Sequence, residues 1–206
     1  IQRIAKLVDA EYLITDDADA FKAAADAAGL QHQVCQRHVV PNTLQIVAQI
    51  GSDLGAWQEA GLITDPGGLG VEQALCDIAD LELMILAGTP SSQPALEALQ
   101  RRYQAAAPPP RGKKASVFYR LRLLTMDLAE DWARLTRHET CREADGRRIL
   151  PATNNVSERN IGQNIKARYR TMRGYKSQWS MKQIPALTAC LHETTDPHVL
   201  QSLLAA

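Results

Sequence analysis

The segment Thr153-Asn154-Asn155-Val156-Ser157-Glu158-Arg159-Asn160 places one carboxylate in a stretch that is otherwise strongly basic. From residue 147 to residue 182 the charged side chains are Arg147, Arg148, Glu158, Arg159, Lys166, Arg168, Arg170, Arg173, Lys176 and Lys182. The chain as a whole has 23 Lys and Arg against 23 Asp and Glu, so this excess of cations is local. A metal ion held against a nucleic-acid phosphate would explain it, because the cations would face the polyanion and the carboxylate would face the metal.

A second candidate carboxylate, Asp16, follows the apolar run of a strand predicted over residues 11–15. Parallel α/β sheets place ligand sites at the carboxyl ends of their strands. The alternative is that Asp16 caps the next helix, predicted over residues 18–28. Asp17 is the better candidate for that cap, which would leave Asp16 available for a ligand.

Two further patterns have both a chemical and a structural interpretation. Cys35-x-x-His38 has the spacing of a metal-ligand pair, but a zinc site needs a second pair and none with recognisable spacing follows. Packing of the thiol and the imidazole is therefore favoured, with zinc as the alternative. Asn155-x-x-Glu158 matches a capping box, in which Asn155 caps a helix and Glu158 reaches back to its amide.

Hydrophobic periodicity predicts a βαβ unit followed by a series of helices. Residues 1–9 are predicted as a short helix, and residues 31–40 as a second strand that ends in a turn at Pro41-Asn42. Strand, helix and strand in this order indicate two parallel strands, and because two strands are not stable alone we expect further strands from outside this sequence. Helical spacing also covers residues 43–60, 71–87, 95–106, 115–138, 155–170, 181–192 and 197–204, with a loop over residues 139–152.

Composition restricts the class of protein. No apolar run is long enough to cross a bilayer and no signal-peptide layout opens the chain, so we expect no membrane partner and a cytoplasmic location. The 4 cysteines lie far apart, which fits reduced thiols better than a disulfide framework. The chain begins with Ile1 and enters a helical pattern directly, so we expect a polypeptide cut from something longer.

The order of these motifs resembles the catalytic domain of DDE transposases with an RNase H-like fold, particularly the bacterial insertion-sequence and Mutator-like groups. Tyr12-Leu13-Ile14-Thr15-Asp16 matches the strand that ends in the family's second catalytic Asp. His32-Gln33-Val34-Cys35-Gln36-Arg37-His38-Val39 matches its Cys-x-x-His segment. Thr153-Asn154-Asn155 and Glu158-Arg159 match its Glu motif. The combination is fairly specific, although no single motif in it is.

The resemblance implies an α/β, predominantly helical chain. Residues 1–42 would form a partial RNase H-like core, residues 43–150 a helical linker and insertion, and residues 151–206 the Glu-bearing basic helix and C-terminal helices. The family's first catalytic Asp lies on an upstream strand without a counterpart here, since Asp9 lies in a helix-to-strand connection. We therefore expect an N-terminally truncated catalytic domain that is catalytically incomplete by itself.

The resemblance also implies the chemistry. Two divalent ions, Mg²⁺ or Mn²⁺, would be held by carboxylates that include Asp16 and Glu158. One ion would activate water or a DNA 3′-hydroxyl and the other would stabilise the leaving oxygen, giving strand cleavage and strand transfer at the ends of a mobile element. Cys35, His38 and Asn155 would support these ligands. The expected partners are double-stranded DNA, both transposon ends and target, and further copies of the chain on that DNA.

The basic run after Glu158 is expected to contact DNA, because it lacks the balancing acids of an ordinary solvent-exposed helix. The cations concerned are Arg159, Lys166, Arg168, Arg170, Arg173 and Lys176. Two alternatives stay open. One is a transposase remnant that binds DNA without cutting it, and the other is an unrelated α/β phosphoryl-transfer domain that uses the Asp at the strand end.

Overall fold

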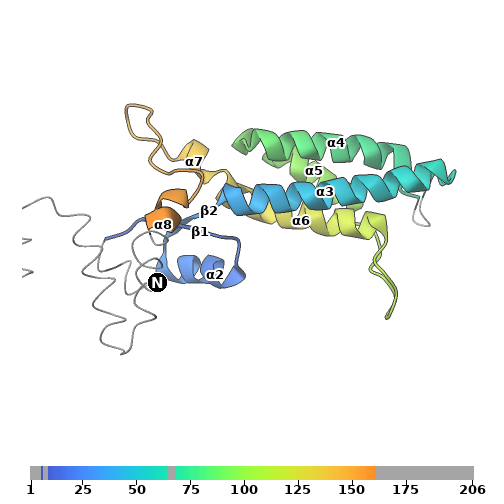
Figure 1. The fold of residues 1–206 in the computed structure, drawn as a ribbon, viewed down its shortest axis with the longest axis horizontal. Helices are drawn as coiled ribbons and strands as arrows, with labels where there is room; N and C mark the ends of the chain where they lie inside the picture. Colours follow the sequence, from blue (N-terminus) through green and yellow to red (C-terminus); the bar gives the residue numbers. More distant parts are fainter. Residues whose placement is uncertain (1–5, 7–8, 65–67, 161–206) are drawn as a thin grey trace, which may run out of the picture. The chain divides into compact units, whose positions relative to one another are not determined.

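The computed structural model describes residues 6, 9–64 and 68–160 of the chain (Figure 1). The chain divides into two compact units, residues 1–153 and residues 154–206, and the second is described over residues 154–160. The described part is α/β and mostly helical, as predicted, and none of its helices is long and apolar enough to span a bilayer. Its elements are β1 (Tyr12–Thr15), α2 (Asp19–Ala28), β2 (Gln31–Val34), α3 (Gln36–Glu59), α4 (Val71–Ala87), a 3-10 turn (Pro90–Ser92), α5 (Gln93–Tyr103), α6 (Val117–Leu135), α7 (Arg137–Thr140) and α8 (Asn155–Asn160).

The two strands form the parallel pair that the sequence predicts. Their register sets Tyr12 beside Gln31 and Thr15 beside Val34. The connecting helix α2 ends at Gly29, whose φ of 68° lies in the left-handed region that glycine adopts without a steric penalty. The pair β1–β2 and its crossover helix are therefore the βαβ unit expected from the order of the elements.

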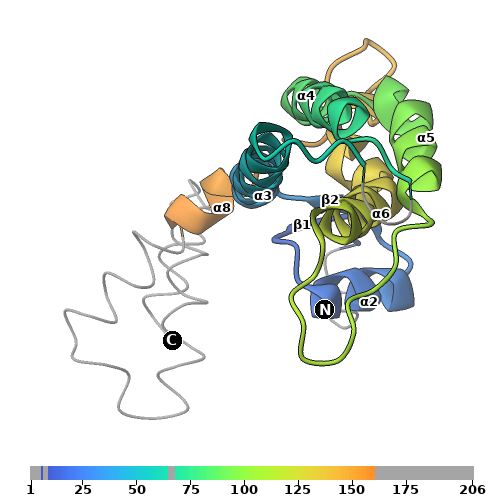
Figure 2. The same ribbon diagram turned by 90° about the vertical axis from the view of Figure 1, so that its right-hand side faces the viewer.

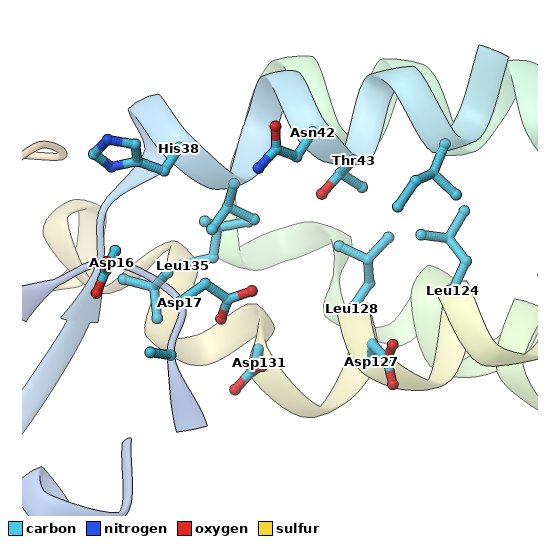
Figure 3. A pocket seen from close by; sticks show the side chains of 14 residues that line it. Asp16, Asp17, His38, Asn42, Thr43, Leu124, Asp127, Leu128, Asp131 and Leu135 are labelled. Carbon is cyan, nitrogen blue, oxygen red and sulfur yellow. The ribbon is translucent and has the colours of Figure 1, made fainter. Parts of the chain in front are cut away.

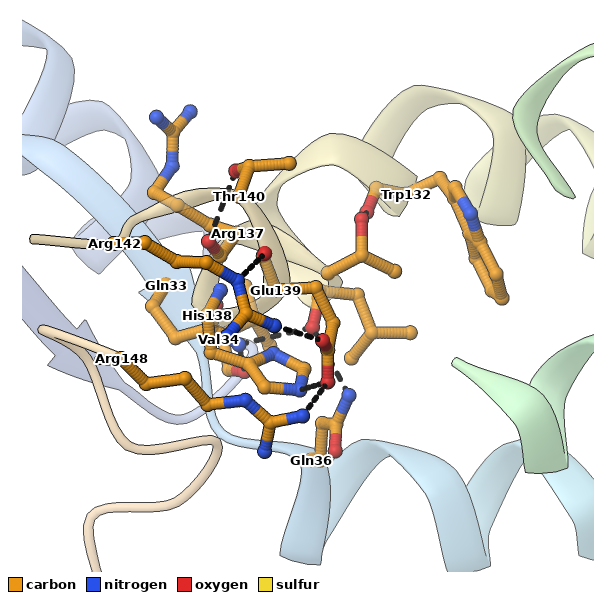
Figure 4. A network of polar contacts seen from close by, with 12 residues as sticks. Gln33, Val34, Gln36, Trp132, Arg137, His138, Glu139, Thr140, Arg142 and Arg148 are labelled. Atoms are coloured by element: carbon orange, nitrogen blue, oxygen red, sulfur yellow. Dashed lines mark hydrogen bonds and ion pairs between the residues drawn. The ribbon is translucent and has the colours of Figure 1, made fainter. Parts of the chain in front are cut away.

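The end of α6 and helix α7 form hydrogen bonds with residues of strand β2. Arg137 Nε donates to the His32 carbonyl at 3.0 Å, and Gln33 Nε2 donates to the Leu135 carbonyl at 2.9 Å. The side-chain oxygen Oε1 of Gln33 in turn accepts from the backbone amide of His138 at 2.8 Å (Figure 4). These bonds satisfy buried polar groups and join the small sheet to the helices, which a two-stranded sheet needs for stability.

Helices α3, α4, α5 and α6 enclose the main hydrophobic core (Figures 1 and 2). The largest fully buried apolar side chains in it are Trp132, Tyr103, Phe118, Ile50, Leu54, Leu81, Leu96 and Leu121. Trp132 also donates from its indole nitrogen to the Thr89 carbonyl at 2.9 Å. Helices α3 and α4 lie close together at Gly51, where a Cβ would be 3.4 Å from Ile78 Cγ2, about an ordinary van der Waals contact. Packing of amphipathic faces accounts for these helices.

The second strand begins at residue 31 as predicted, but the prediction that it extends to residue 40 and ends in a turn at Pro41-Asn42 was wrong. Strand β2 ends at Val34 and helix α3 already begins at Gln36, so Pro41 lies within a helix. The same helix runs through the boundary expected between residues 42 and 43. The Cys-x-x-His motif thus opens a helix instead of closing a strand.

Tertiary contacts at the start of α3 explain that difference. Cys35 N donates to the Thr15 carbonyl at 2.7 Å and Gln36 N donates to the Ala152 carbonyl at 3.0 Å, so amides at the helix start have partners outside the helix. Further along, the buried face of α3 packs into the core. This packing outweighs the tendency of Pro41 to break a helix. Local sequence rules take account of that tendency but not of the packing.

The bounds predicted for the other helices agree more closely with the structure. Helix α4 has the predicted bounds, and the ends of α2, α5 and α6 lie within three residues of the predicted ends. The helices predicted over residues 181–192 and 197–204 lie outside the described residues, as do most of the helix over residues 1–9 and the part of the 155–170 helix beyond Asn160.

Candidate functional site

A cavity of about 520 Å³ lies at the end of strand β1, between α3 and α6 (Figure 3). Its acidic lining comes from Asp16 and Asp17, directly after β1, and from Asp127 and Asp131 on α6. The remaining lining is mostly apolar and includes Leu128. The cavity therefore combines carboxylates with a hydrophobic wall, a lining typical of binding sites.

The structure brings Asp16 and the Cys-x-x-His motif to the same edge of the sheet. Because β1 and β2 are parallel and in register, the 2.7 Å bond from Cys35 N to the Thr15 carbonyl fixes Cys35 next to the end of β1. His38, in the first turn of α3, is exposed and lines the cavity together with the exposed Asp16. The side chain of Cys35 is 0% exposed, so it packs in the interior.

A single lysine organises the carboxylates beside Asp16. Lys22 Nζ lies 2.7 Å from Asp17 Oδ1 and also forms an ion pair with Asp131. Burial would lower the pKa of Lys22, but these two carboxylates outweigh burial and hold the pKa well above its usual range. The prediction that Asp17 caps helix α2 was wrong, because Ala18 is the N-cap residue and no side chain caps the helix. Asp17 is drawn to the cation instead.

Asp127 and Asp16 differ from the two carboxylates that bind Lys22. Partial burial, followed by repulsion from Asp131 and Glu130, raises the pKa of Asp127. The carboxylate of Asp16 makes no hydrogen bond or ion pair with any other described residue. Asp127 has no such partner among the described residues either, but partial burial on α6 disfavours its charged form, whereas Asp16 is exposed at the end of β1, where a ligand can reach it.

A buried histidine supports the end of β1. His32 is 2% exposed, and its Nε2 lies 2.8 Å from the Thr15 hydroxyl, which donates to the Asp16 carbonyl at 2.9 Å. Burial, and then the charge of Arg134, lowers the pKa of His32, so the neutral ring is favoured. This chain of contacts ties the backbone of Asp16 to β2, and motif spacing did not reveal it.

A second polar network surrounds Glu139 (Figure 4). Its carboxylate accepts from Arg148 and, at 3.1 Å, from Arg142, and it lies 3.3 Å from Nε2 of the buried His138. Arg147 likewise pairs with Glu143 at 2.8 Å. The first two cations of the basic stretch thus form ion pairs with acids that precede the stretch in the sequence.

The Glu motif lies in the second unit. Glu158 and Arg159 are exposed on α8, and Glu158 N donates to the Asn154 carbonyl at 3.0 Å. Helix α8 begins at Asn155, so Asn155 occupies its first turn and is not the cap that the capping-box alternative required. Asp16 belongs to the first unit and Glu158 to the second, and their sharing of a metal stays a prediction. The other expected DNA contacts lie outside the described residues: Lys166, Arg168, Arg170, Arg173 and Lys176.

The described His, Cys, Asp and Glu side chains do not form a metal site by themselves. The part of the chain that the structure describes contains no group of three or more His, Cys, Asp or Glu side chains arranged to hold a metal ion. The described residues therefore add no further zinc ligands to Cys35 and His38, and they add no complete set of metal ligands to Asp16. Comparison of the chain with protein-family models, curated proteins and solved structures gave no match.

Sequence reasoning found Asp16 but missed the lysine and the two α6 acids around it. Asp127 and Asp131 are four positions apart on a helix, which places them on one face. That spacing was a usable signal. The sequence contained no such signal for Lys22, because a lone lysine on a surface helix is ordinary unless its distant partner is known.

Proposed function

We propose that the chain supplies part of a metal-dependent site for DNA strand cleavage and strand transfer, with Asp16 and Glu158 as ligands. The observation that carries this proposal is the uncompensated carboxylate of Asp16 at the carboxyl end of a parallel strand, in a cavity that His38 also lines. Lys22 pairs with the adjacent Asp17, whereas the exposed carboxylate of Asp16 makes no ion pair with any described cation. The parallel βαβ unit supports an RNase H-like core as the finer description of the fold.

The donors suit the ions only in part. Carboxylate oxygens are the ligands that Mg²⁺ and Mn²⁺ prefer, and such ions supply an activated nucleophile and stabilise the leaving oxygen of a phosphodiester. The described residues lack a complete ligand set, so Asp16 needs Glu158 and at least one further donor to form the site. Asp16 would bind an ion, while Arg159, exposed beside Glu158, would contact a DNA phosphate.

Manganese binding tests the pairing of the two acids directly. Mn²⁺ would be titrated into the 206-residue chain and followed by electron paramagnetic resonance, for the wild type, Asp16→Asn, Glu158→Gln and the double variant. We expect each single variant to bind Mn²⁺ at least about tenfold more weakly, and the double variant to be little worse than either, because both acids serve one site. Asp19→Asn is the matched control, since that side chain is fully exposed and lies three positions away.

Nicking of supercoiled plasmid is the functional measurement. In a longer chain that also supplies the family's first catalytic Asp, Mn²⁺-dependent nicking should occur in the wild type, disappear in Asp16→Asn and Glu158→Gln, and persist in Asp19→Asn. If Glu158→Gln binds Mn²⁺ as the wild type does while Asp16→Asn does not, the two acids do not share a site and the proposal fails.

One observation favours a second candidate, a DNA-binding remnant that does not cut. It is the lack of a three-ligand group among the described residues. A labelled DNA duplex would then bind the chain, with an affinity that falls steeply with salt, and neither Mn²⁺ nor Asp16→Asn would change it. DNA binding without any metal-dependent nicking by the longer chain that supplies the first catalytic Asp would select this candidate. Assembly of several copies on transposon ends and target DNA belongs to the first proposal.

A further inference from the structure

Helix α4 is apolar on two opposite faces. One face packs into the core, through residues such as Ile78, Leu81 and Ile85. On the other side Leu83 is 66% exposed and Leu86 is 59% exposed. Figure 2 shows α4 at the outer edge of the helical group, with α5 beside it and α3 and α6 below. A surface helix normally carries polar residues on its outward face, so this second apolar face needs an explanation.

The exposed apolar residues follow the spacing of a helix-pairing seam. They are Cys76, Ala79, Leu83 and Leu86, all exposed and separated alternately by three and four positions. This alternation keeps side chains on one stripe of a helix and is the pattern by which two helices pack side by side. We refer to these four residues as the outer stripe of α4.

The charges beside the outer stripe define its partner. Glu72, Asp80 and Glu82 are exposed on α4, and the helix contains no Lys or Arg. Asp80 and Glu82 flank the stripe on its two sides, as the positions beside a pairing seam do. A second copy of α4 would bring like charges together, which disfavours self-association, whereas a helix with Lys or Arg at these positions would be attracted.

We propose that the outer stripe of α4 is a docking site for a helix of another protein that carries a leucine-rich stripe flanked by Lys or Arg. The partner's apolar side chains would cover Leu83 and Leu86, and its cations would face Asp80 and Glu82. In this mode of binding, an amphipathic helix inserts apolar side chains at helical spacing into a partner surface. The proposal does not depend on the metal site.

Two designed peptides test both parts of the proposal. Each has about four heptads, with Leu at the seam positions, fluorescein at one end and either Lys or Glu at the flanking positions. Fluorescence anisotropy would measure their binding to the full chain. We expect the Lys peptide to bind at least about tenfold more tightly than the Glu peptide, and Asp80→Lys with Glu82→Lys to reverse this preference.

Leu83→Asp separates docking from general attraction between opposite charges. This substitution adds negative charge, so simple electrostatics would strengthen binding of the Lys peptide, whereas loss of the apolar anchor weakens it at least about tenfold. Ile63→Asp is the control, because Ile63 is 79% exposed and lies outside α4. The bound Lys peptide should also slow alkylation of the exposed Cys76, read by mass mapping.

Three outcomes would overturn the proposal. Equal binding of both peptides would remove the charge argument, and unchanged or tighter binding by Leu83→Asp would remove the stripe. Sedimentation of the chain alone as a dimer that Leu83→Asp dissociates would assign the stripe to a second copy.

Discussion

Lys22 and Asp131 join helix α2 to helix α6 by a direct ion pair, although 109 positions separate them in the sequence. The Lys22 side chain is only 15% exposed and also binds Asp17 at 2.7 Å. Water therefore screens these interactions weakly. One cation thus holds together two of the acids that line the cavity beside Asp16 and fixes α2 against the helical group.

We predict that Lys22→Met lowers the free energy of unfolding by about 1 to 3 kcal/mol, because it leaves the partly buried Asp131 and the more exposed Asp17 without their cation. Urea denaturation of the two proteins gives the difference. Lys113→Met is the control, since Lys113 is exposed in a loop. The loss should shrink when Asp131→Asn is already present, and equal losses in both backgrounds would show that the ion pair contributes nothing.

Asp77 forms a second buried polar centre, between α4 and α5. Its carboxylate is almost fully buried and accepts from Tyr103, from Arg102 and, at 2.9 Å, from Gln73. Burial, and then the bond to Asp77, raises the pKa of Tyr103 well above its usual range. We predict that Tyr103→Phe costs roughly 1 to 3 kcal/mol of stability, because it removes a donor from a buried charge while keeping the ring. Urea denaturation measures this loss. The control is Tyr119→Phe on α6, where the ring is only half-buried, and it should cost less than half as much stability.

Stability should fall as the solution becomes acidic, through two buried histidines. Burial is the main cause that lowers the pKa of His32 and of His138 below the ordinary 6.5. Below that pH the unfolded chain binds protons that the folded chain resists, so unfolding takes up protons and the free energy of unfolding decreases as pH falls from about 7.5 to 5.5. His32→Gln combined with His138→Gln should flatten this slope, measured by urea denaturation across the range. A slope that is unchanged in the double variant would assign the pH dependence to other groups.

Pro41 should lower the stability of helix α3 in the protein as it stands. It lies within α3, where proline cannot donate to the helical ladder. We predict that Pro41→Ala raises the free energy of unfolding by roughly 1 to 3 kcal/mol. Pro94→Ala is a matched control, because Pro94 occupies the first turn of α5, where its missing amide costs little. If Pro41→Ala destabilises the chain instead, the rigidity that proline gives the unfolded chain outweighs the missing hydrogen bond.

The sequence alone determined those elements whose signals are local. The bounds of α4 follow from helical periodicity between Gly70 and Gly88, and the parallel pairing of β1 and β2 follows from the order strand, helix, strand. The candidate Asp16 was also within reach of sequence reasoning, since it directly follows an apolar strand.

Only the tertiary structure decided what distant residues do to one another. Helix α3 runs through Pro41 because its buried face packs into the core, and Asp17 binds Lys22 instead of capping α2 because Asp131 helps to hold that cation beside it. In the sequence, the apolar residues of α4 show only helical periodicity. The fold buries one of its two apolar faces in the core and leaves the other exposed. Local periodicity reports which residues share a face, whereas long-range packing and charge decide what that face meets.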